Sequence, residues 1–137
     1  MTSDEVRERF ASSPVARLAT VGADGRPHLV PVVFALVDDT VCMAVDHKPK
    51  TTRALRRLDN IAATGHVSLL VDHYEGDWSQ LWWLRVDGNA QVVDADSPDG
   101  VTAIDALVAK YPQYDDARPE GPAIVVRDLQ WHHWLSR

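Results

Sequence analysis

The stretch RLATVGADGRPHLVPVVFAL, residues 17–36, decides the fold that this sequence predicts. Its first five residues belong to a strand expected over residues 15–21. The glycines of the turn at residues 22–25 can take positive φ, which favours a hairpin into a second strand over residues 28–37. Pro31 lies inside that second strand, where it has no N–H to donate to a neighbour. We therefore predict an edge position or a bulge at Pro31, and bulges often lie beside binding sites.

The rest of the chain predicts four more strands and three short helices. The helix over residues 98–110 has the clearest start, because Ser97 can cap it and Pro98 suits its first position. Gly88 is expected to bend or bulge the longest strand. Six strands in 137 residues predict a single α+β, mainly β domain over residues 1–137, with an antiparallel sheet curled into a small barrel. The further strands are expected over residues 40–45, 66–72, 80–93 and 123–135, and the further helices over residues 3–12 and 50–59.

The segment HKPKTTRALRRL, residues 47–58, concentrates positive charge. It carries five cations and no acid, although the chain has a formal net charge of -6. It follows a predicted strand and opens a predicted helix, whose free N–H groups and dipole favour an anion. This arrangement suggests a cradle for the phosphate or carboxylate groups of a cofactor, with a solvated helix face as the simpler alternative. The five cations are Lys48, Lys50, Arg53, Arg56 and Arg57.

Composition argues against several classes of function. The N-terminus lacks the apolar stretch of a signal peptide, and no apolar run approaches the ~20 residues that cross a bilayer, so we expect a cytoplasmic protein without a membrane partner. The net negative charge argues against nucleic acid as a partner. The six histidines show no metal-binding spacing, and the adjacent His132 and His133 point to opposite faces of a strand. We therefore expect no metal site.

The side chains form no recognisable catalytic group. Cys42, the single cysteine, lies among apolar residues in a strand and is expected to be a buried structural thiol. Asp72, Glu75 and Asp77 could be paired carboxylates for acid–base chemistry, or simply a solvated turn. The chain has neither a GxGxxG nor a P-loop motif. An enzymatic reaction would therefore rely on a bound cofactor, with the protein supplying its placement.

Three segments together resemble a known family. They are the stretch at residues 17–36, the helix start KPKTTRALRRL at residues 48–58, and VSLLVDHYEGDWSQLWWLRVDGNAQVV at residues 67–93. The chain resembles the pyridoxamine-phosphate-oxidase-like, flavin-binding split-barrel family, and within it the small actinobacterial proteins assigned as deazaflavin (coenzyme F420)-dependent oxidoreductases. The motifs DGRP and DWSxLWWxRxxG are the most specific to that branch. The resemblance implies a six-stranded antiparallel split β-barrel and a homodimer with two cofactor sites across the subunit interface.

The resemblance also implies where the cofactor binds. The basic segment matches the part of the family that holds the cofactor's phosphate, and the second strand matches the backbone that runs alongside its ring system. Trp78 matches an aromatic residue that comes near the ring from the second subunit. The candidates for the phosphate are Lys48, Lys50, Thr51 and Arg53 or Arg56, and those for the ring are Pro31, Val32, Val33 and Phe34.

The leading functional hypothesis is an oxidoreductase that transfers hydride between a bound deazaflavin and a small organic substrate. FMN is the alternative cofactor; it has one phosphate, whereas the deazaflavin has a polyglutamate tail whose extra carboxylates suit five neighbouring cations better. An FMN-dependent oxidase or reductase and a non-catalytic carrier of flavin or haem stay open as alternatives. The substrate is expected to meet the loops at residues 72–77 and 112–122.

The strand over residues 80–93 independently predicts a subunit contact. Trp82 and Trp83 point to opposite faces of this strand, so both faces carry large apolar side chains. A small barrel can bury one of these faces in its core. A second copy of the chain is the simplest cover for the other, so we predict an obligate homodimer.

Overall fold

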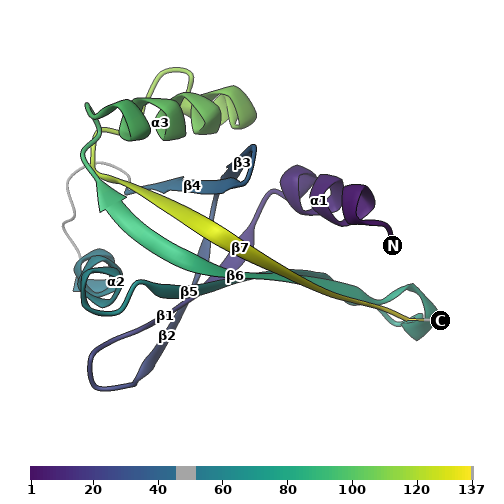
Figure 1. Ribbon diagram of the computed structural model, residues 1–137. Coiled ribbons are helices and arrows are strands. Elements are labelled where there is room, and N and C mark those ends of the chain that lie inside the picture. Colours follow the sequence, from purple (N-terminus) through teal and green to yellow (C-terminus); the bar gives the residue numbers. More distant parts are fainter. Residues whose placement is uncertain (46–51, 137) are drawn as a thin grey trace.

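The computed structural model describes residues 1–45 and 52–136, and the side chains of residues 52–55 are outside that description. These residues form three α-helices, two short 3-10 helices and seven strands (Figure 1). The helices are α1 Ser3–Ser12, α2 Thr52–Ala63, α3 Pro98–Lys110, η1 Trp78–Gln80 and η2 Pro112–Tyr114. The strands are β1 Ala16–Val21, β2 Pro27–Val32, β3 Ala35–Val37, β4 Thr40–Ala44, β5 His66–His73, β6 Trp82–Val93 and β7 Ala123–Leu135.

The strands form one antiparallel sheet in the order β2-β1-β5-β6-β7-β4-β3. The two edge strands, β2 and β3, follow each other in the chain, so residues 33–34 cross from one edge of the curled sheet to the other. The prediction of one strand over residues 28–37, and hence of six strands, is wrong. The run is divided because β2 pairs with β1 whereas β3 pairs with β4. Pro31 does lie in an edge strand, as predicted, where its missing N–H disturbs no ladder.

The main core lies on the inner face of the curled sheet and includes residues from α1 and α2. Phe10 of α1 is fully buried, with its ring 4.6 Å from that of Phe34 and 5.3 Å from that of Trp131. Ile61 of α2 joins the same cluster. Helix α3 packs on the other side of β4 and β7, where Ile104 meets residues of both strands, and Figure 1 shows it as a separate layer.

The helices α1 and α3 begin and end as predicted because their starts are encoded locally. Thr2 and Glu5 form a capping box at α1, with the Glu5 N–H donating to the Thr2 hydroxyl at 3.2 Å. At α3 the Ser97 hydroxyl accepts from the Gly100 N–H at 3.0 Å, and Pro98 occupies the first helical position.

Helix α2 runs to Ala63, four residues beyond the predicted end at Asp59. The apolar spacing continues through Ile61, which is 4% exposed, so the packing of this side chain extends the helix. Gly65, with φ of 73°, then ends it in the left-handed conformation that glycine adopts most easily. The predicted start at Lys50 lies outside the described residues.

The ends of β5, β6 and β7 project away from α2 as an arm, and the C-terminus lies at its tip (Figure 1). The predicted irregularity at Gly88 is confirmed, because the β6–β7 register shifts between Asp87 and Asn89. A Cβ atom on Gly88 would lie 2.7 Å from a methyl carbon of Val126, so only glycine fits this bulge. In the described part of the chain, no helix has the length and apolar character needed to cross a membrane.

Candidate functional site

The backbone expected to run alongside the cofactor ring lies where the chain leaves β2 and crosses to β3. Pro31 is exposed, whereas Val32 and Phe34 are 8% and 0% exposed, with both side chains in the core. Pro31 lies opposite Arg17 of β1 in the ladder, and in the described residues no strand pairs with the other side of β2. The segment therefore offers backbone rather than large side chains to a ligand.

The expected phosphate-binding residues are only partly described. Lys48, Lys50 and Thr51 lie outside the described residues, and Arg53 is placed in the first turn of α2 without its side chain. Arg56 is exposed and lines a small cavity of about 90 Å³ between α2 and the β1–β2 hairpin. Among the predicted phosphate-binding residues, Arg56 is the one whose side chain is described, and it lies at this cavity.

Two further residues, Arg26 and His28, line the cavity beside Arg56. The amide of Asn60 closes it and donates to the Thr20 hydroxyl at 3.0 Å, which ties α2 to β1. With one acid on its wall, Asp24, the cavity has an excess of positive charge and suits a phosphate-sized anion. The sequence alone assigned no role to Arg26 or His28, although Arg26 belongs to the DGRP motif, one of the two most specific motifs of the chain.

The cavity and the exposed backbone lie at the two ends of β2. Arg26 precedes Pro31 by five residues, about 16 Å at ~3.3 Å per residue of strand. A ligand that touches both must therefore be elongated, with an anionic group at the hairpin end and a flat group at the crossing.

The sheet face turned away from the core carries an open groove of about 540 Å³ over β1, β2, β5 and β6. Leu29 and Tyr74 on its wall are 67% and 65% exposed. The lining also includes Arg17, Ala19, Ser68, Leu70, Asp72, Trp83 and Arg85. We call this surface the outer face. It combines large apolar side chains with charges of both signs.

The two adjacent tryptophans of β6 have different environments. Trp83 lines the groove on the outer face, opposite Trp134 of β7, which is 40% exposed. Trp82 packs against the core, with the guanidinium of Arg9 4.8 Å from its ring centre and the His73 ring stacked at 6.2 Å. The outward apolar character of β6 is limited to Trp83, because Arg85 and Asp87 follow it on the same face.

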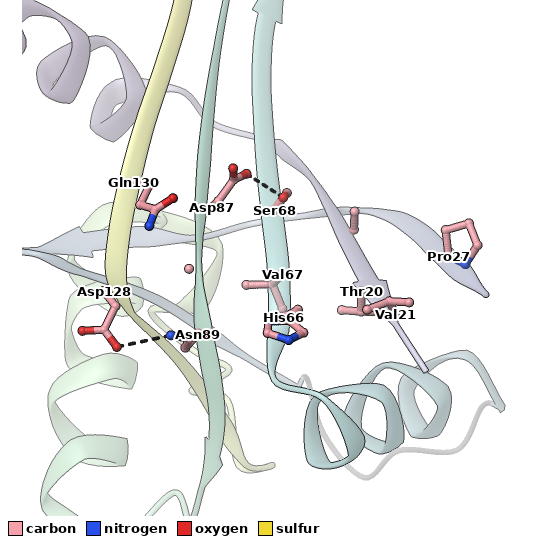
Figure 2. A pocket seen from close by; sticks show the side chains of 12 residues that line it. Thr20, Val21, Pro27, His66, Val67, Ser68, Asp87, Asn89, Asp128 and Gln130 are labelled. Atoms are coloured by element: carbon pink, nitrogen blue, oxygen red, sulfur yellow. Dashed lines mark hydrogen bonds between the residues drawn. The ribbon is translucent and has the colours of Figure 1, made fainter. Parts of the chain in front are cut away.

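A second cavity, of about 500 Å³, continues along the outer face towards the hairpin (Figure 2). The Asp87 carboxylate accepts from the Ser68 hydroxyl at 2.7 Å and from Arg85 Nε at 3.0 Å, and His132 lies 3.3 Å away. Burial raises the pKa of Asp87, but the hydrogen bonds from Ser68 and Arg85 outweigh it and leave the pKa below its ordinary value. Asp87 is therefore a fixed carboxylate rather than a proton donor.

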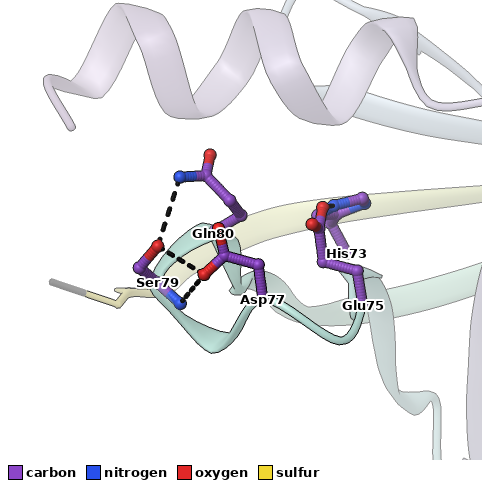
Figure 3. Close-up of polar contacts among 5 residues, drawn as sticks. All are labelled: His73, Glu75, Asp77, Ser79 and Gln80. Carbon is purple, nitrogen blue, oxygen red and sulfur yellow. Dashed lines mark hydrogen bonds and ion pairs between the residues drawn. The ribbon is translucent and has the colours of Figure 1, made fainter.

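The carboxylates of the loop between β5 and β6 do not form an acid–base pair. Glu75 pairs with His73, and the Asp77 carboxylate accepts from the Ser79 hydroxyl at 2.6 Å and its N–H at 3.1 Å (Figure 3). The Ser79 hydroxyl lowers the pKa of Asp77, which caps η1. Trp78 in the same loop is 76% exposed and begins η1, between the end of β5 and the start of β6.

The single cysteine has the structural role that was predicted. Cys42 is 2% exposed in β4, and burial raises the pKa of its thiol to about 11. Within the described ranges, no group of three or more His, Cys, Asp or Glu side chains could hold a metal ion. His132 and His133 face opposite sides of β7, as expected, since they stand opposite Arg85 and Leu84.

The model of the pyridoxamine 5'-phosphate oxidase family matches residues 2–134 of this chain. The chain belongs to this family. A comparison with curated proteins gives no significant match. The structure accordingly has the split-barrel fold of the pyridoxamine 5'-phosphate oxidase family, with three α-helices and a seven-stranded antiparallel sheet in the described residues.

Solved structures with the same fold include proteins of different described functions. A conserved hypothetical protein from Mycobacterium tuberculosis matches with a TM-score of 0.77 and 21% identity, over 100% of this chain and 86% of that one. The haem storage protein HutZ from Vibrio cholerae matches with a TM-score of 0.73 and 19% identity, over 97% and 93%. An FAD-binding protein from Mycobacterium smegmatis matches with a TM-score of 0.64 and 17% identity, over 98% of each chain. At these identities the likeness is one of fold.

Proposed function

We propose that this protein is an oxidoreductase that binds the deazaflavin coenzyme F420 and transfers hydride to or from a small organic substrate. One observation carries the proposal: the edge strand β2, which ends at Pro31 and Val32, leads back to a cavity lined by Arg26, His28 and Arg56. An elongated cofactor with a flat ring and an anionic tail fits this arrangement. Two proteins with the same fold are described as FAD-binding, which supports a flavin-like ligand.

The charge distribution favours the deazaflavin over FMN. FMN has a single phosphate, which two or three cations satisfy. Arg26 adds to the five cations of residues 47–58, so more positive charge is available than one phosphate needs. The additional carboxylates of the deazaflavin tail would use this surplus. An FMN-dependent oxidase or reductase is the alternative for the same site.

Hydride chemistry belongs to the cofactor, and the protein's residues bind and orient it. In the proposed site, backbone at Pro31, Val32, Val33 and Phe34 lies against the ring. The anionic part meets cations from the segment before α2, from α2 and from the hairpin. The proposed anion-binding residues are Lys48, Lys50, Thr51, Arg53, Arg56, Arg26 and His28.

We further propose that the active unit is a homodimer formed through the outer face. Leu29, Tyr74 and Trp134 leave large apolar areas in water in a single chain, and a second copy is the cover that symmetry supplies most simply. In such a dimer Trp78 of one subunit would reach the site of the other. The substrate would then meet residues of both subunits.

A non-catalytic carrier is a second candidate, because two proteins with this fold are described as a haem storage protein and a haem-binding protein. An oxidoreductase and a carrier can be distinguished by experiment. A carrier binds its ligand without reducing any substrate, and a haem carrier gives a Soret band on titration with haem.

The test is equilibrium dialysis of the purified protein against F420, FMN and haem, with absorption spectra of each complex. We expect F420 to bind more tightly than FMN, and the bound F420 to exchange hydride with a chemical reductant. Tighter binding of FMN would transfer the proposal to FMN-dependent chemistry. Binding of haem alone would refute the oxidoreductase and support the carrier.

A further inference from the structure

The backbone at the crossing between β2 and β3 obtains its hydrogen bonds from α3 rather than from the sheet. Phe34 belongs to neither strand, so its N–H and C=O have no ladder partner. Its N–H donates to the Tyr111 hydroxyl at 3.1 Å, and its carbonyl accepts from Lys110 Nζ at 2.9 Å. Two side chains more than 70 residues away in the sequence thus replace the missing ladder.

The same two side chains join this crossing to the end of α1. Lys110 Nζ also donates to the carbonyl of Ser13 at 2.8 Å, and the Tyr111 hydroxyl lies 3.0 Å from the carbonyl of Pro14, to which it can donate. Three backbone carbonyls, at residues 13, 14 and 34, are therefore gathered around one ammonium and one phenol. This geometry fixes the position of the crossing relative to the core.

The environment of the two groups is enclosed. Tyr111 is 8% exposed, and Lys110 is partly buried, with its Nζ 3.9 Å from the centre of the Phe34 ring. The structure gives Lys110 no carboxylate partner in the described residues; it contacts carbonyls, the Phe34 ring and the Tyr111 ring. The ammonium therefore has no counter-ion among the described residues, and its contacts hold the backbone carbonyls in place.

We propose that Lys110 and Tyr111 are positioning residues for the cofactor: they hold the crossing backbone at Phe34, and with it the edge at residues 31–33 that faces the ring. The proposal rests on the function proposed above. Val33 packs against the cluster that contains Tyr111, so the edge and the clamp are in contact. A crossing without these hydrogen bonds would be free to move relative to β2, and a bound ring would lose its fixed support.

The test compares Lys110→Met, Lys110→Arg and Tyr111→Phe with the wild type. Three readouts are needed: the dissociation constant of F420, the fluorescence anisotropy of the bound deazaflavin, and amide hydrogen exchange at Phe34 without cofactor. We expect Lys110→Met and Tyr111→Phe to weaken binding about tenfold, the effect of one lost hydrogen bond of this kind. Both should lower the anisotropy and speed exchange at Phe34, and Lys110→Arg should restore most of the affinity.

Asp105→Asn is the matched control, because it changes one charge on an exposed pair of the same helix, with Arg118, and leaves the clamp intact. It should behave as the wild type. Faster exchange at Phe34 with unchanged affinity and anisotropy would overturn the positioning role and leave a structural one. If the wild type binds neither F420 nor FMN, the proposed function fails first and the positioning role fails with it.

Discussion

Replacing Trp83 by glutamate should convert the protein to a monomer and abolish cofactor binding at the same time. The groove that contains Trp83 also contains Leu29 and Tyr74, which are 67% and 65% exposed, and Trp134 beside it is 40% exposed. With ~150–250 Å² for an aromatic side chain, these three leave on the order of 300 Å² uncovered in each chain. Covering both copies removes about 600 Å², worth about 15 kcal/mol at ~25 cal/mol per Å².

This gain exceeds the smaller estimates of the cost of association, about 4–15 kcal/mol, so a stable dimer is expected. Trp83→Glu places an unpaired carboxylate in the contact twice, once from each subunit. At about 3 kcal/mol or more for each buried unpaired charge, the dimer loses at least ~6 kcal/mol. The dissociation constant should therefore rise by about 10⁴-fold or more.

Sedimentation equilibrium over a range of concentrations measures this change, with the cofactor's dissociation constant measured in parallel. Val101→Glu is the control, because Val101 is 40% exposed on α3 and is not among the residues that line the groove. It should stay dimeric. A folded Trp83→Glu monomer that binds F420 at wild-type affinity would refute the reasoning, because the site would then be contained in one chain.

Three other outcomes follow from the basic segment and from Lys110. Lys50→Ala should weaken cofactor binding by about 1.5–3 kcal/mol, the value of a charge-assisted hydrogen bond, and unchanged affinity in a titration would return Lys50 to a solvated helix face. Affinity should fall with salt more steeply for F420 than for FMN, because more charge pairs are screened, and equal slopes would remove the preference for F420. Burial lowers the pKa of Lys110 to about 8 from 10.5, so the unfolded chain binds the extra proton between these values. The free energy of unfolding of the wild type should therefore rise from pH 8 to 10 relative to Lys110→Met in urea titrations, and a constant difference would contradict the pKa.

The sequence predicted α1 and α3 correctly because both helices have local start signals. At α1 and α3 a capping side chain, and at α3 also a proline at the first position, stand within a few residues of each start, so the sequence indicates the boundaries directly. The division between β2 and β3 could not be predicted in this way. Residues 28–37 form a continuous β-prone run, and the crossing at Phe34 is held by Lys110 and Tyr111, which are distant in the sequence.

The same distinction, between local signals and contacts distant in the sequence, applies to the candidate site. The backbone at Pro31 and the charge of residues 47–58 were visible in the sequence, since one is a missing donor and the other a local excess of cations. Arg26 and His28 were not assigned, because their role depends on the hairpin folding back against Arg56 of α2. The hairpin and Arg56 are some thirty residues apart in the sequence, and only the fold brings them together. Periodicity and composition do not predict such a contact.

The position of Trp78 bears on whether one chain can form the whole site. Helix α2 lies beside Ala90 of β6, whereas Trp78 lies beyond Trp82, at the opposite end of that strand. Ala90 follows Trp82 by eight residues, about 26 Å at ~3.3 Å per residue, and β6 stays paired with β7 on both sides of the bulge at Gly88, so it does not fold back over this length. Trp78 therefore cannot reach the anionic part of a ligand held beside α2 of its own chain. If Trp78 contacts the part of a cofactor that lies beside α2, it does so from a second subunit, and the homodimer is then a requirement of the site rather than an addition to it.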